Sequence, residues 1–483
     1  MLTTLAAPAF ADTWCIENGN ITVKAGDTEG TNKVSQGSII DREDTNTIIT
    51  NQKTDTASSH TVTIDANGKN DKVEVTLDNV NIKAGSGSAL TSKGDVTLTL
   101  KGDNHLTGGI SDNGSYGLSG ISSSGSLTIS GGTVTATGGD STGSNGLGGR
   151  GICSDSGGVT ISGGSTVTAN GGNGSSGRDG ISSSSGVTVS DGTVTATGGN
   201  STGSYGSGGD GIRSDGGVTI SGGTVKAAGG DSKDGYGGDG IRSDGGVTIS
   251  GNTVNAAGGS GGKVGGYGIC SFDRVAISGG TVTANGGDGS SGGDGIRSGD
   301  IDLSGSLELT AKAGSPNGKA LSQRGNELDL DDIKDKLGPG AKVTTTDADG
   351  KVNQVPIPGP VEPEEPVIPE ESSSSSDGGS ATPSTPASPL PGLTVTDKSG
   401  AVISYTSTQS GNTLTVCVGR FTASLRASLS TLRQLRAEGI DTITFQTILC
   451  STTLSVDELL AMGGEDAEAV LTHRLTDSSL TVG

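Results

Sequence analysis

The chain has 483 residues, of which 29% are hydrophobic and 2% aromatic; it contains 89 glycines and carries a formal net charge of −22. This is too little apolar material for conventional globular cores along the whole chain. The acidic balance disfavours binding to nucleic acid or to anionic lipid, because both need clustered Lys and Arg. The acidity suits the solubility of an exported protein, with cation binding as the alternative.

The first eleven residues end in Ala9-Phe10-Ala11, the pattern of small residues that precedes a signal cleavage site. The positive start and most of the apolar stretch of a signal peptide are missing. We interpret residues 1–11 as the remnant of a secretory signal, and an ordinary N-terminus is the alternative. A secreted or cell-surface location follows from this interpretation. No run of about 20 apolar residues occurs, so no membrane span is predicted.

Apolar and polar residues alternate in segments 73–82 and 95–100, as they do in half-buried strands. These segments precede a regular array of repeats between residues 108 and 314. We therefore expect residues 12–107 to form an N-terminal cap and irregular first units of that array.

The array repeats Gly-Ile-x-Ser, Val-Thr-Ile-Ser-Gly-Gly and Thr-Val-Thr-Ala-x-Gly-Gly. Copies of the second phrase begin 26 to 32 residues apart, at Leu127, Val159, Val187, Val218, Val247, Val275 and Ile301. Such a period indicates stacked structural units. Three short alternating segments and three glycine-rich bends in each copy predict a triangular coil. The predicted fold class is all-β, a right-handed parallel β-helix, and an array of separate hairpins is the alternative.

Stacking of the coils would align equivalent apolar residues in buried columns. The predicted columns are Ile152, Ile181, Ile212, Ile241, Ile269 and Ile296; Val159, Val187, Val218, Val247 and Val275; and Ala136, Ala169, Ala196, Ala227, Ala256 and Ala284.

The repeat fades after Ser315. Residues 315–354 are predicted to cap the array, with a short helix at 328–337 before Gly338. Residues 355–392, rich in Pro, Glu and Ser, are predicted to be a disordered linker. Residues 393–483 are predicted to form a small α+β domain. Its expected elements are a hairpin around 410–412, a helix through Leu425, Leu429, Leu432 and Leu435, strands at 440–445 and 471–482, and a helix at 456–462.

Acidic residues recur directly before the Gly-Ile pairs, at Asp179, Asp210, Asp239 and Asp294, and arginines follow at Arg213, Arg242 and Arg297. Stacked carboxylates repel one another unless the charge is relieved. We predict a surface ladder of compensated charge, and we assign Asp210, Asp239, Arg213 and Arg242 as candidate ligand-binding residues. The segment superficially resembles a calcium-binding nonapeptide, but the sixth position is not Asp and the period differs, so no metal site is predicted.

Variation in repeat length is concentrated at one corner of the coil, in corner loops such as segments 140–150, 199–210 and 258–267. Insertions at one corner project from one side, which is often the binding side of a repeat protein. Four tyrosines lie in these corner loops and are candidates for stacking on sugar rings: Tyr116, Tyr205, Tyr236 and Tyr267. Outward Thr-x-Thr-x-Thr rows suggest ice binding as an alternative, although Lys226 and Asn255 interrupt them.

The sequence provides little for catalysis or for a cofactor. The three histidines, His60, His105 and His473, lie outside the array. No nucleophile or metalloprotease motif occurs, so neither catalytic residues nor cofactors are predicted. Cys153 and Cys270 occupy equivalent positions four units apart, about 19 Å at about 4.8 Å per unit, which is too far for a disulfide. Cys417 and Cys450 are close enough in sequence to share the C-terminal domain, where they could pair.

Segment 73–100 and the repeated Gly-Ile-x-Ser and Val-Thr-Ile-Ser-Gly-Gly-Thr-Val-Thr-Ala phrases resemble secreted bacterial proteins labelled "carbohydrate-binding domain-containing", of the type common in gut Firmicutes. The resemblance covers roughly residues 60–313. It implies a pectin-lyase-like parallel β-helix and glycans or host or cell-wall polysaccharides as partners. We therefore expect a non-enzymatic, secreted or cell-surface protein that binds carbohydrate or acts like an adhesin. The alternatives are a structural spacer and a polysaccharide lyase or hydrolase.

Overall fold

The computed structural model describes residues 12–66, 72–355, 393–397, 402–403, 405–410, 412–418, 422–447, 451–462, 467–473 and 478–482. The chain divides into two compact units, residues 1–365 and 366–483. The predicted signal remnant at 1–11 lies outside the described residues, and so does the predicted linker apart from Val355.

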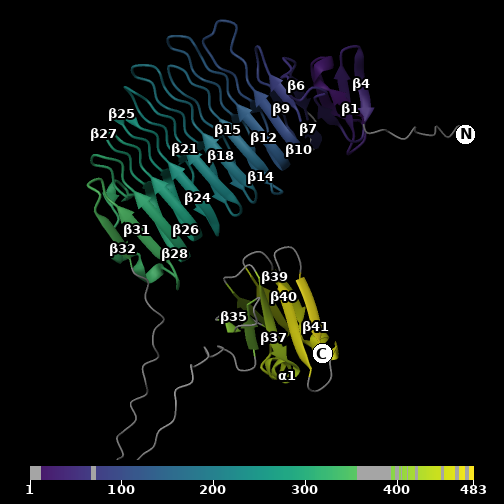
Figure 1. Ribbon diagram of the computed structural model, residues 1–483, viewed down its shortest axis with the longest axis vertical. Helices are drawn as coiled ribbons and strands as arrows, with labels where there is room; N and C mark the ends of the chain where they lie inside the picture. The colour runs from purple at the N-terminus through teal and green to yellow at the C-terminus, as the bar shows by residue number, and fades with distance from the viewer. Residues whose placement is uncertain are drawn as a thin grey trace, which may run out of the picture. The chain divides into compact units, whose positions relative to one another are not determined.

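The first unit is a parallel β-helix, as the repeats predict. One coil consists of β19 (Ile212–Ser214), β20 (Gly217–Ile220) and β21 (Thr224–Ala228). Each strand pairs in parallel with its equivalent in the next coil: β22 (Ile241–Ser243), β23 (Val247–Ile249) and β24 (Asn252–Ala257). The strands of successive coils lie side by side in Figure 1. Because neighbouring strands come from different copies of the repeat, the separate-hairpin alternative is wrong.

The coils produce three rows of parallel strands along the array. The first row contains β2 (Ile21–Ala25), β6 (Val62–Asp65), β9 (Leu90–Lys93), β11 (Ile121–Ser123), β13 (Ile152–Ser154), β16 (Ile181–Ser183), β19, β22, the beginnings of β26 (Ile269–Asn285) and β28 (Ile296–Lys312), and β29 (Leu321–Gln323).

The second row contains β1 (Thr13–Cys15), β5 (Ile48–Thr50), β7 (Lys72–Asp78), the beginnings of β10 (Asp95–Thr107) and β12 (Leu127–Thr137), β14 (Gly158–Ser162), β17 (Gly186–Val189), β20, β23, and the middle of β26 and β28. The third contains β8 (Asn81–Lys83), the ends of β10 and β12, β15 (Thr166–Asn170), β18 (Thr193–Thr197), β21, β24, the ends of β26 and β28, and β31 (Lys342–Thr346). The parallel rows thus already include β1 and β2.

The predicted columns of apolar residues form the core. Ile212 is the direct strand neighbour of Ile181 on one side and of Ile241 on the other, and the valine and alanine columns are in register in the same way. All three columns are exposed by no more than 1%. Burial of each isoleucine or valine contributes about 1.5–3 kcal/mol, so the columns add to the stability of every coil.

Antiparallel strands cover the N-terminal end of the array. Strands β3 (Asn32–Gln36) and β4 (Ile39–Asp44) follow β2 as a meander. The Trp14 ring N–H donates a hydrogen bond of 2.8 Å to the carboxylate of Asp44, which is fully buried. A short 3-10 turn, Ile16–Asn18, links β1 to β2. The open end of the core is therefore closed by a fold that the repeats do not specify.

The opposite end is closed by short elements, not by the predicted helix. Segment 328–337 forms two 3-10 turns, Leu330–Asp332 and Lys334–Lys336. The two turns meet at Ile333, which has φ −110° and ψ −14°, and the second turn ends at Leu337 in extended conformation, so the helical path is interrupted twice. Both side chains are buried against the core. Strand β30 (Asn326–Glu327) pairs with β29, and β32 (Val352–Val355) pairs with β31. Val355 thus belongs to the cap and not to the linker, in which the sequence analysis placed it.

Glycines hold the corner loops together. Each loop has an outgoing arm after the third strand and a returning arm before the next Gly-Ile. The N–H of Gly209, on a returning arm, donates 2.9 Å to the carbonyl of Gly199 on the outgoing arm, and the Gly230 N–H of the next loop donates 2.8 Å to the Gly209 carbonyl. We call this assembly the glycine layer; in the central loops it contains Gly198, Gly199, Gly208, Gly209, Gly229, Gly230, Gly237, Gly238, Gly258, Gly259, Gly265 and Gly266.

Only glycine fits these positions. A Cβ atom on Gly199 would lie 2.0 Å from the Gly172 carbonyl oxygen, and one on Gly208 would lie 1.9 Å from that of Gly230. The corner loops project from one edge of the strands, as Figure 1 shows, and are themselves stacked. Strands β25 (Gly261–Val264) and β27 (Gly289–Ser291) continue this pairing within the loops. The abundance of glycine therefore has a packing cause.

The second unit is a small α+β domain with two sheets. One sheet has the order β34 (Val402–Ile403), β33 (Leu393–Thr396), β37 (Ala423–Ser428), β40 (Glu468–His473) and β41 (Ser478–Val482), and the other has β35 (Thr406–Ser410), β36 (Thr413–Cys417), β38 (Thr442–Gln446) and β39 (Ser451–Ser455). Helices α1 (Leu429–Ala437) and α2 (Val456–Met462) complete it.

Most of the predicted elements of this domain are present. Hairpin β35–β36 lies where residues 410–412 suggest, and α2 has the predicted bounds. The predicted strand at 471–482 is instead two strands, β40 and β41. Leu425 is not helical but lies in β37, because the chain first completes a sheet strand and Ser428 then caps α1 through the N–H of Thr431. Cys450 lies outside the described residues, so its pairing with Cys417 stays a prediction.

We predict that substitution Gly209→Ala destabilises the array, since the new Cβ would lie 2.0 Å from the Arg178 carbonyl oxygen. Overpacking of this kind costs about 1–3 kcal/mol. The matched control is Gly85→Ala, in another loop, where the new Cβ meets no atom within 4 Å. Urea unfolding should shift to lower denaturant for Gly209→Ala only, and equal midpoints for the two variants would contradict the glycine layer.

Candidate functional site

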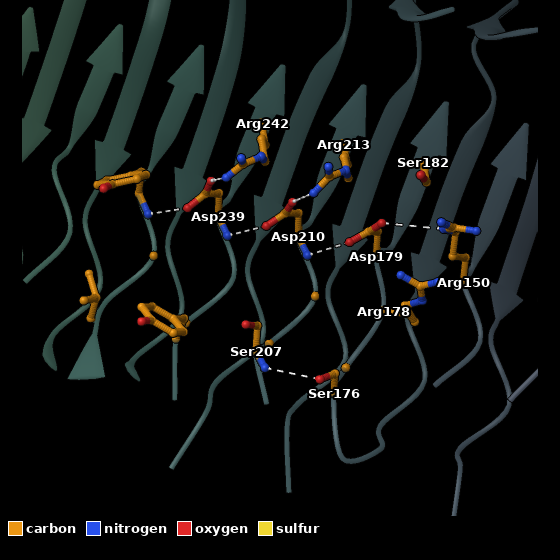
Figure 2. Close-up of a pocket in the computed structure, with 18 of the residues that line it drawn as sticks. Arg150, Ser176, Arg178, Asp179, Ser182, Ser207, Asp210, Arg213, Asp239 and Arg242 are labelled. Atoms are coloured by element: carbon orange, nitrogen blue, oxygen red, sulfur yellow. Dashed lines mark hydrogen bonds and ion pairs between the residues drawn. The ribbon is translucent and has the colours of Figure 1, made fainter. Parts of the chain in front are cut away.

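A groove with a volume of about 710 Å³ lies where the returning arms of the corner loops meet the first row of strands. Two sets of residues line it. The ends of the returning arms and the first strands contribute Arg150, Arg178, Asp179, Ser182, Asp210, Arg213, Asp215, Asp239, Arg242 and Tyr267, and the loops above them contribute Ser176, Ser207, Tyr236, Val264 and the intervening glycines. The groove therefore crosses several coils, with equivalent positions repeated along it (Figure 2).

The aspartates in the groove link successive coils. One oxygen of Asp179 accepts a hydrogen bond of 3.0 Å from the backbone N–H of Asp210. Asp210 accepts likewise from Asp239 at 2.7 Å, and Asp239 from the N–H of Tyr267 at 2.7 Å. Asp294 accepts from the Lys319 N–H at 2.9 Å. Figure 2 shows the first three carboxylates as a row across the coils. Each carboxylate thus satisfies a backbone donor that the strand ladder leaves free at this corner.

The second oxygen of each aspartate faces an arginine. The Oδ2 atoms of Asp210 and Asp239 lie 3.5 Å and 3.2 Å from the NH1 atoms of Arg213 and Arg242. Asp294 has the same relation to Arg297, at 3.7 Å. The predicted charge compensation is therefore present, but the ladder is not on the surface: these aspartates are 4–7% exposed. They are buried because the glycine layer brings the returning arms over them.

Burial dominates the ionisation of this row. It raises the pKa of Asp210 well above the ordinary value, with the charges of Asp239 and Asp179 adding to the effect. Burial also raises the pKa of Asp239, while the hydrogen bond from the Tyr267 N–H and the charge of Arg242 act to lower it. Burial, with Asp239 nearby, raises the pKa of the Cys270 thiol to about 12. That thiol is protonated at neutral pH and is a poor nucleophile.

The four candidate tyrosines do not form one platform. Tyr236 and Tyr267 line the groove. Tyr116 lines a neighbouring hollow of about 200 Å³, which Arg150 and Arg178 also line. Tyr205 is 81% exposed and lines neither of these two hollows. Only two of the four predicted rings are therefore placed to meet a ligand in the groove.

Both groove tyrosines are held by cations. The Lys263 ammonium lies 5.7 Å from the centre of the Tyr236 ring and 4.6 Å from that of Tyr205. Arg297 lies 5.0 Å from the centre of the Tyr267 ring and donates a hydrogen bond of 2.8 Å to the Tyr267 hydroxyl. Such contacts are worth about 0.5–1 kcal/mol at exposed sites, so they favour these ring orientations before any ligand arrives.

Sequence reasoning missed two groove residues, Arg150 and Arg178, and also Lys263, which contacts the Tyr236 ring from outside the groove lining. Arg150 occupies the aspartate position one coil earlier, and its Nε lies 3.6 Å from Asp179 Oδ2. Alignment of the positions before each Gly-Ile would have found it. No repeat signal marks Lys263, because it lies in a loop of variable length.

A second ladder on the outgoing arms was also missed. Asp140, Asn173, Asn200 and Asp231 each accept a backbone N–H from the next coil, at distances of 2.7–2.8 Å. Both asparagine and aspartate occur as acceptors in this exposed ladder. Among these four residues the common feature is therefore a side-chain carbonyl oxygen and not a charge.

Two further features concern metals and membranes. Within the described residues, no group of three or more His, Cys, Asp or Glu side chains is arranged to hold a metal ion. No helix in the same part of the chain is long and apolar enough to cross a membrane.

We predict that Asp210→Asn retains the fold whereas Asp210→Ala weakens it. Asparagine can still accept the Asp239 N–H, as Asn173 and Asn200 do in the second ladder, but alanine leaves a buried donor unpaired, at a cost of about 1–3 kcal/mol. Thermal or urea unfolding of both variants measures the difference, and equal destabilisation would contradict the proposed role of the carboxylate.

The same variants test the pH dependence. Because the folded state holds a proton on Asp210 at pH values where the unfolded chain has lost it, stability should fall as pH rises from about 4 through the raised pKa. In Asp210→Asn the decrease in stability with rising pH should be smaller, because asparagine does not ionise. The same pH dependence in wild type and Asp210→Asn would contradict the raised pKa of this buried carboxyl group.

Comparison with known proteins agrees with this architecture. A family model described as a beta helix repeat matches residues 127–149, 159–185, 218–241 and 275–294. No curated protein and no solved structure matches the chain. In these segments the chain is similar to beta helix repeat proteins, and its first unit is a parallel β-helix.

Proposed function

We propose that the protein binds glycans in the groove between the corner loops and the first row of strands, without catalysing their cleavage. The observation that carries this proposal is the pairing of two oriented tyrosine rings, Tyr236 and Tyr267, with a row of guanidinium groups in one elongated groove. Tyrosine rings stack on the apolar faces of sugars, and guanidinium groups donate to their oxygens.

The geometry of the groove suits a polymer. It crosses coils that repeat about every 4.8 Å, so a chain-like ligand would meet equivalent groups at regular steps. Arg213 and Arg242 occupy neighbouring positions of this kind. Host or cell-wall polysaccharides are partners of the appropriate shape, and an adhesin-like role at the cell surface would use the same contacts.

Binding is favoured over hydrolysis by the state of the carboxylates. Hydrolysis of a glycosidic bond commonly uses two carboxyl groups free to exchange protons with substrate and water. In the groove, Asp210 and Asp239 each accept a backbone N–H with one oxygen and face an arginine with the other. Both side chains are 10% exposed or less. A polysaccharide lyase or hydrolase is therefore the less favoured role for this groove.

A structural spacer is the second candidate function. The glycine layer and the apolar columns make each coil depend on its neighbours, which favours a stiff array. Either role suits an exported protein, as the Ala9-Phe10-Ala11 pattern and the net charge of −22 suggest.

A glycan array with wild type, Tyr236→Ala and Tyr205→Ala tests the proposal. Loss of a stacked ring in the groove should weaken binding about tenfold, since contacts of this kind are worth about 1 kcal/mol or more. Tyr205→Ala removes an exposed ring outside the groove and serves as the matched control. Product release from the same glycans would instead indicate an enzyme, and failure of the wild type to bind any glycan would leave the spacer.

A further inference from the structure

Arg178 breaks the glycine layer. It occupies the second glycine position of a returning arm, directly before Asp179. The equivalent positions in the neighbouring coils hold Gly149, Gly209, Gly238, Gly266 and Gly293. Added Cβ atoms at those five glycines would lie about 2 Å from backbone atoms. A long cationic side chain has thus been placed where the rest of the array excludes any side chain.

The Arg178 guanidinium has no partner among the residues that the structure describes. Within the described part of the chain it makes no hydrogen bond and no ion pair, although it is half-buried. Burial lowers its pKa, and the charge of Arg150 adds to the effect, while Asp179 opposes it. An incompletely solvated cation beside a second cation is unfavourable unless an anion compensates it.

Arg150 is also incompletely satisfied. Its Nε is buried and makes no hydrogen bond, and its nearest carboxylate oxygens, on Asp179 and Asp155, lie at 3.6 Å and 3.8 Å. Figure 2 shows Arg178 next to Arg150 at one end of the aspartate row. Both side chains line the groove and the adjoining hollow at Tyr116.

The groove presents its guanidinium groups more openly than its buried carboxylates. The side chains of Arg150, Arg213 and Arg242 are 28%, 38% and 28% exposed. Those of Asp179, Asp210 and Asp239 are 9%, 10% and 6% exposed, and their oxygens already face backbone N–H groups and arginines. An incoming anion would therefore meet donors before acceptors.

We propose that Arg178 and Arg150 form an anion subsite that selects glycans carrying a carboxylate or sulfate group on the sugar. This inference rests on the proposed glycan binding and specifies the ligand class. The net charge of −22 repels anions at long range, so recognition depends on these local donors. A guanidinium can hold an oxyanion through two parallel hydrogen bonds.

Calorimetry with three oligosaccharides of equal length tests the subsite: a hexuronic acid oligomer, a sulfated oligomer and an uncharged oligomer. Arg178→Gln should weaken binding of the anionic oligomers at least about tenfold, the usual effect of losing a charged hydrogen bond. It should leave binding of the uncharged oligomer unchanged. The two anionic arms show which group the subsite prefers.

The control is Arg274→Gln, which removes the same charge from an arginine paired with Asp300 and Asp302 outside the groove. It should leave the affinity for anionic oligomers unchanged. The thermal midpoint of Arg178→Gln should not fall, because the substitution removes no native hydrogen bond or ion pair within the described residues. Addition of salt should weaken binding of the anionic oligomers but not of the uncharged one.

Two results would overturn the subsite while leaving glycan binding intact. One is that wild type binds the uncharged oligomer as tightly as the anionic ones and Arg178→Gln changes neither. The other is that Arg178→Gln lowers the thermal midpoint and weakens all three oligomers alike, which indicates a structural role. If no oligomer binds wild type and the wider glycan array is also negative, the proposed function fails together with the subsite.

Discussion

In-register parallel pairing of one coil with the next is the constraint on which the whole first unit depends. Each backbone group in a strand is satisfied by the neighbouring copy, so a residue is positioned mainly by the equivalent residue before and after it. The alignment of Ile212 with Ile181 and Ile241 is the simplest consequence. Equivalent positions in successive coils therefore have similar surroundings, and the same residue types recur at them.

The corners extend this constraint to polar groups. Where the chain leaves the strand ladder, a backbone N–H still needs an acceptor in the adjacent coil. Buried aspartates provide it on the returning arms, and exposed Asp or Asn residues provide it on the outgoing arms. The buried version needs arginines in addition, because a stack of carboxylates away from water is unfavourable without positive charge nearby. Structure at the corner therefore creates the charged groove as a by-product of satisfying the backbone.

The β-helix itself could be predicted from the sequence because its cause is periodic. Isoleucine, valine and alanine recur at fixed positions, and a parallel stack is the arrangement that buries them all. The depth of Asp210 and Asp239 could not be predicted in this way. It depends on the corner loops folding back over the strands, and the cause of that folding is the contact of Gly209 with Gly199 and Gly230 across different loops. The end caps likewise lack a periodic cause: the segment predicted as a helix is two tight turns that break at Ile333 and Leu337, and the repeat pattern gives no signal for these breaks.

Residues that depart from the repeat were the least predictable and are the most informative about the groove. Tyr267 takes the place of an aspartate, and Arg178 the place of a glycine. Tyr267 interrupts the row of carboxylate acceptors, and Arg178 adds a cation whose guanidinium makes no hydrogen bond or ion pair with the residues that the structure describes. Sequence comparison between copies identifies both positions, but only the folded corner reveals that they line the same groove.

Apart from departures such as Arg178 and Tyr267, the internal coils present the same kinds of acceptor, apolar column and glycine contact to the coil above as to the coil below. Internal coils are therefore interchangeable modules, and duplication or deletion of a whole repeat would create no new kind of interface. Such an event would lengthen or shorten the groove by one coil spacing while leaving both caps untouched. The length of the groove is thus open to change by simple recombination between repeats of the gene.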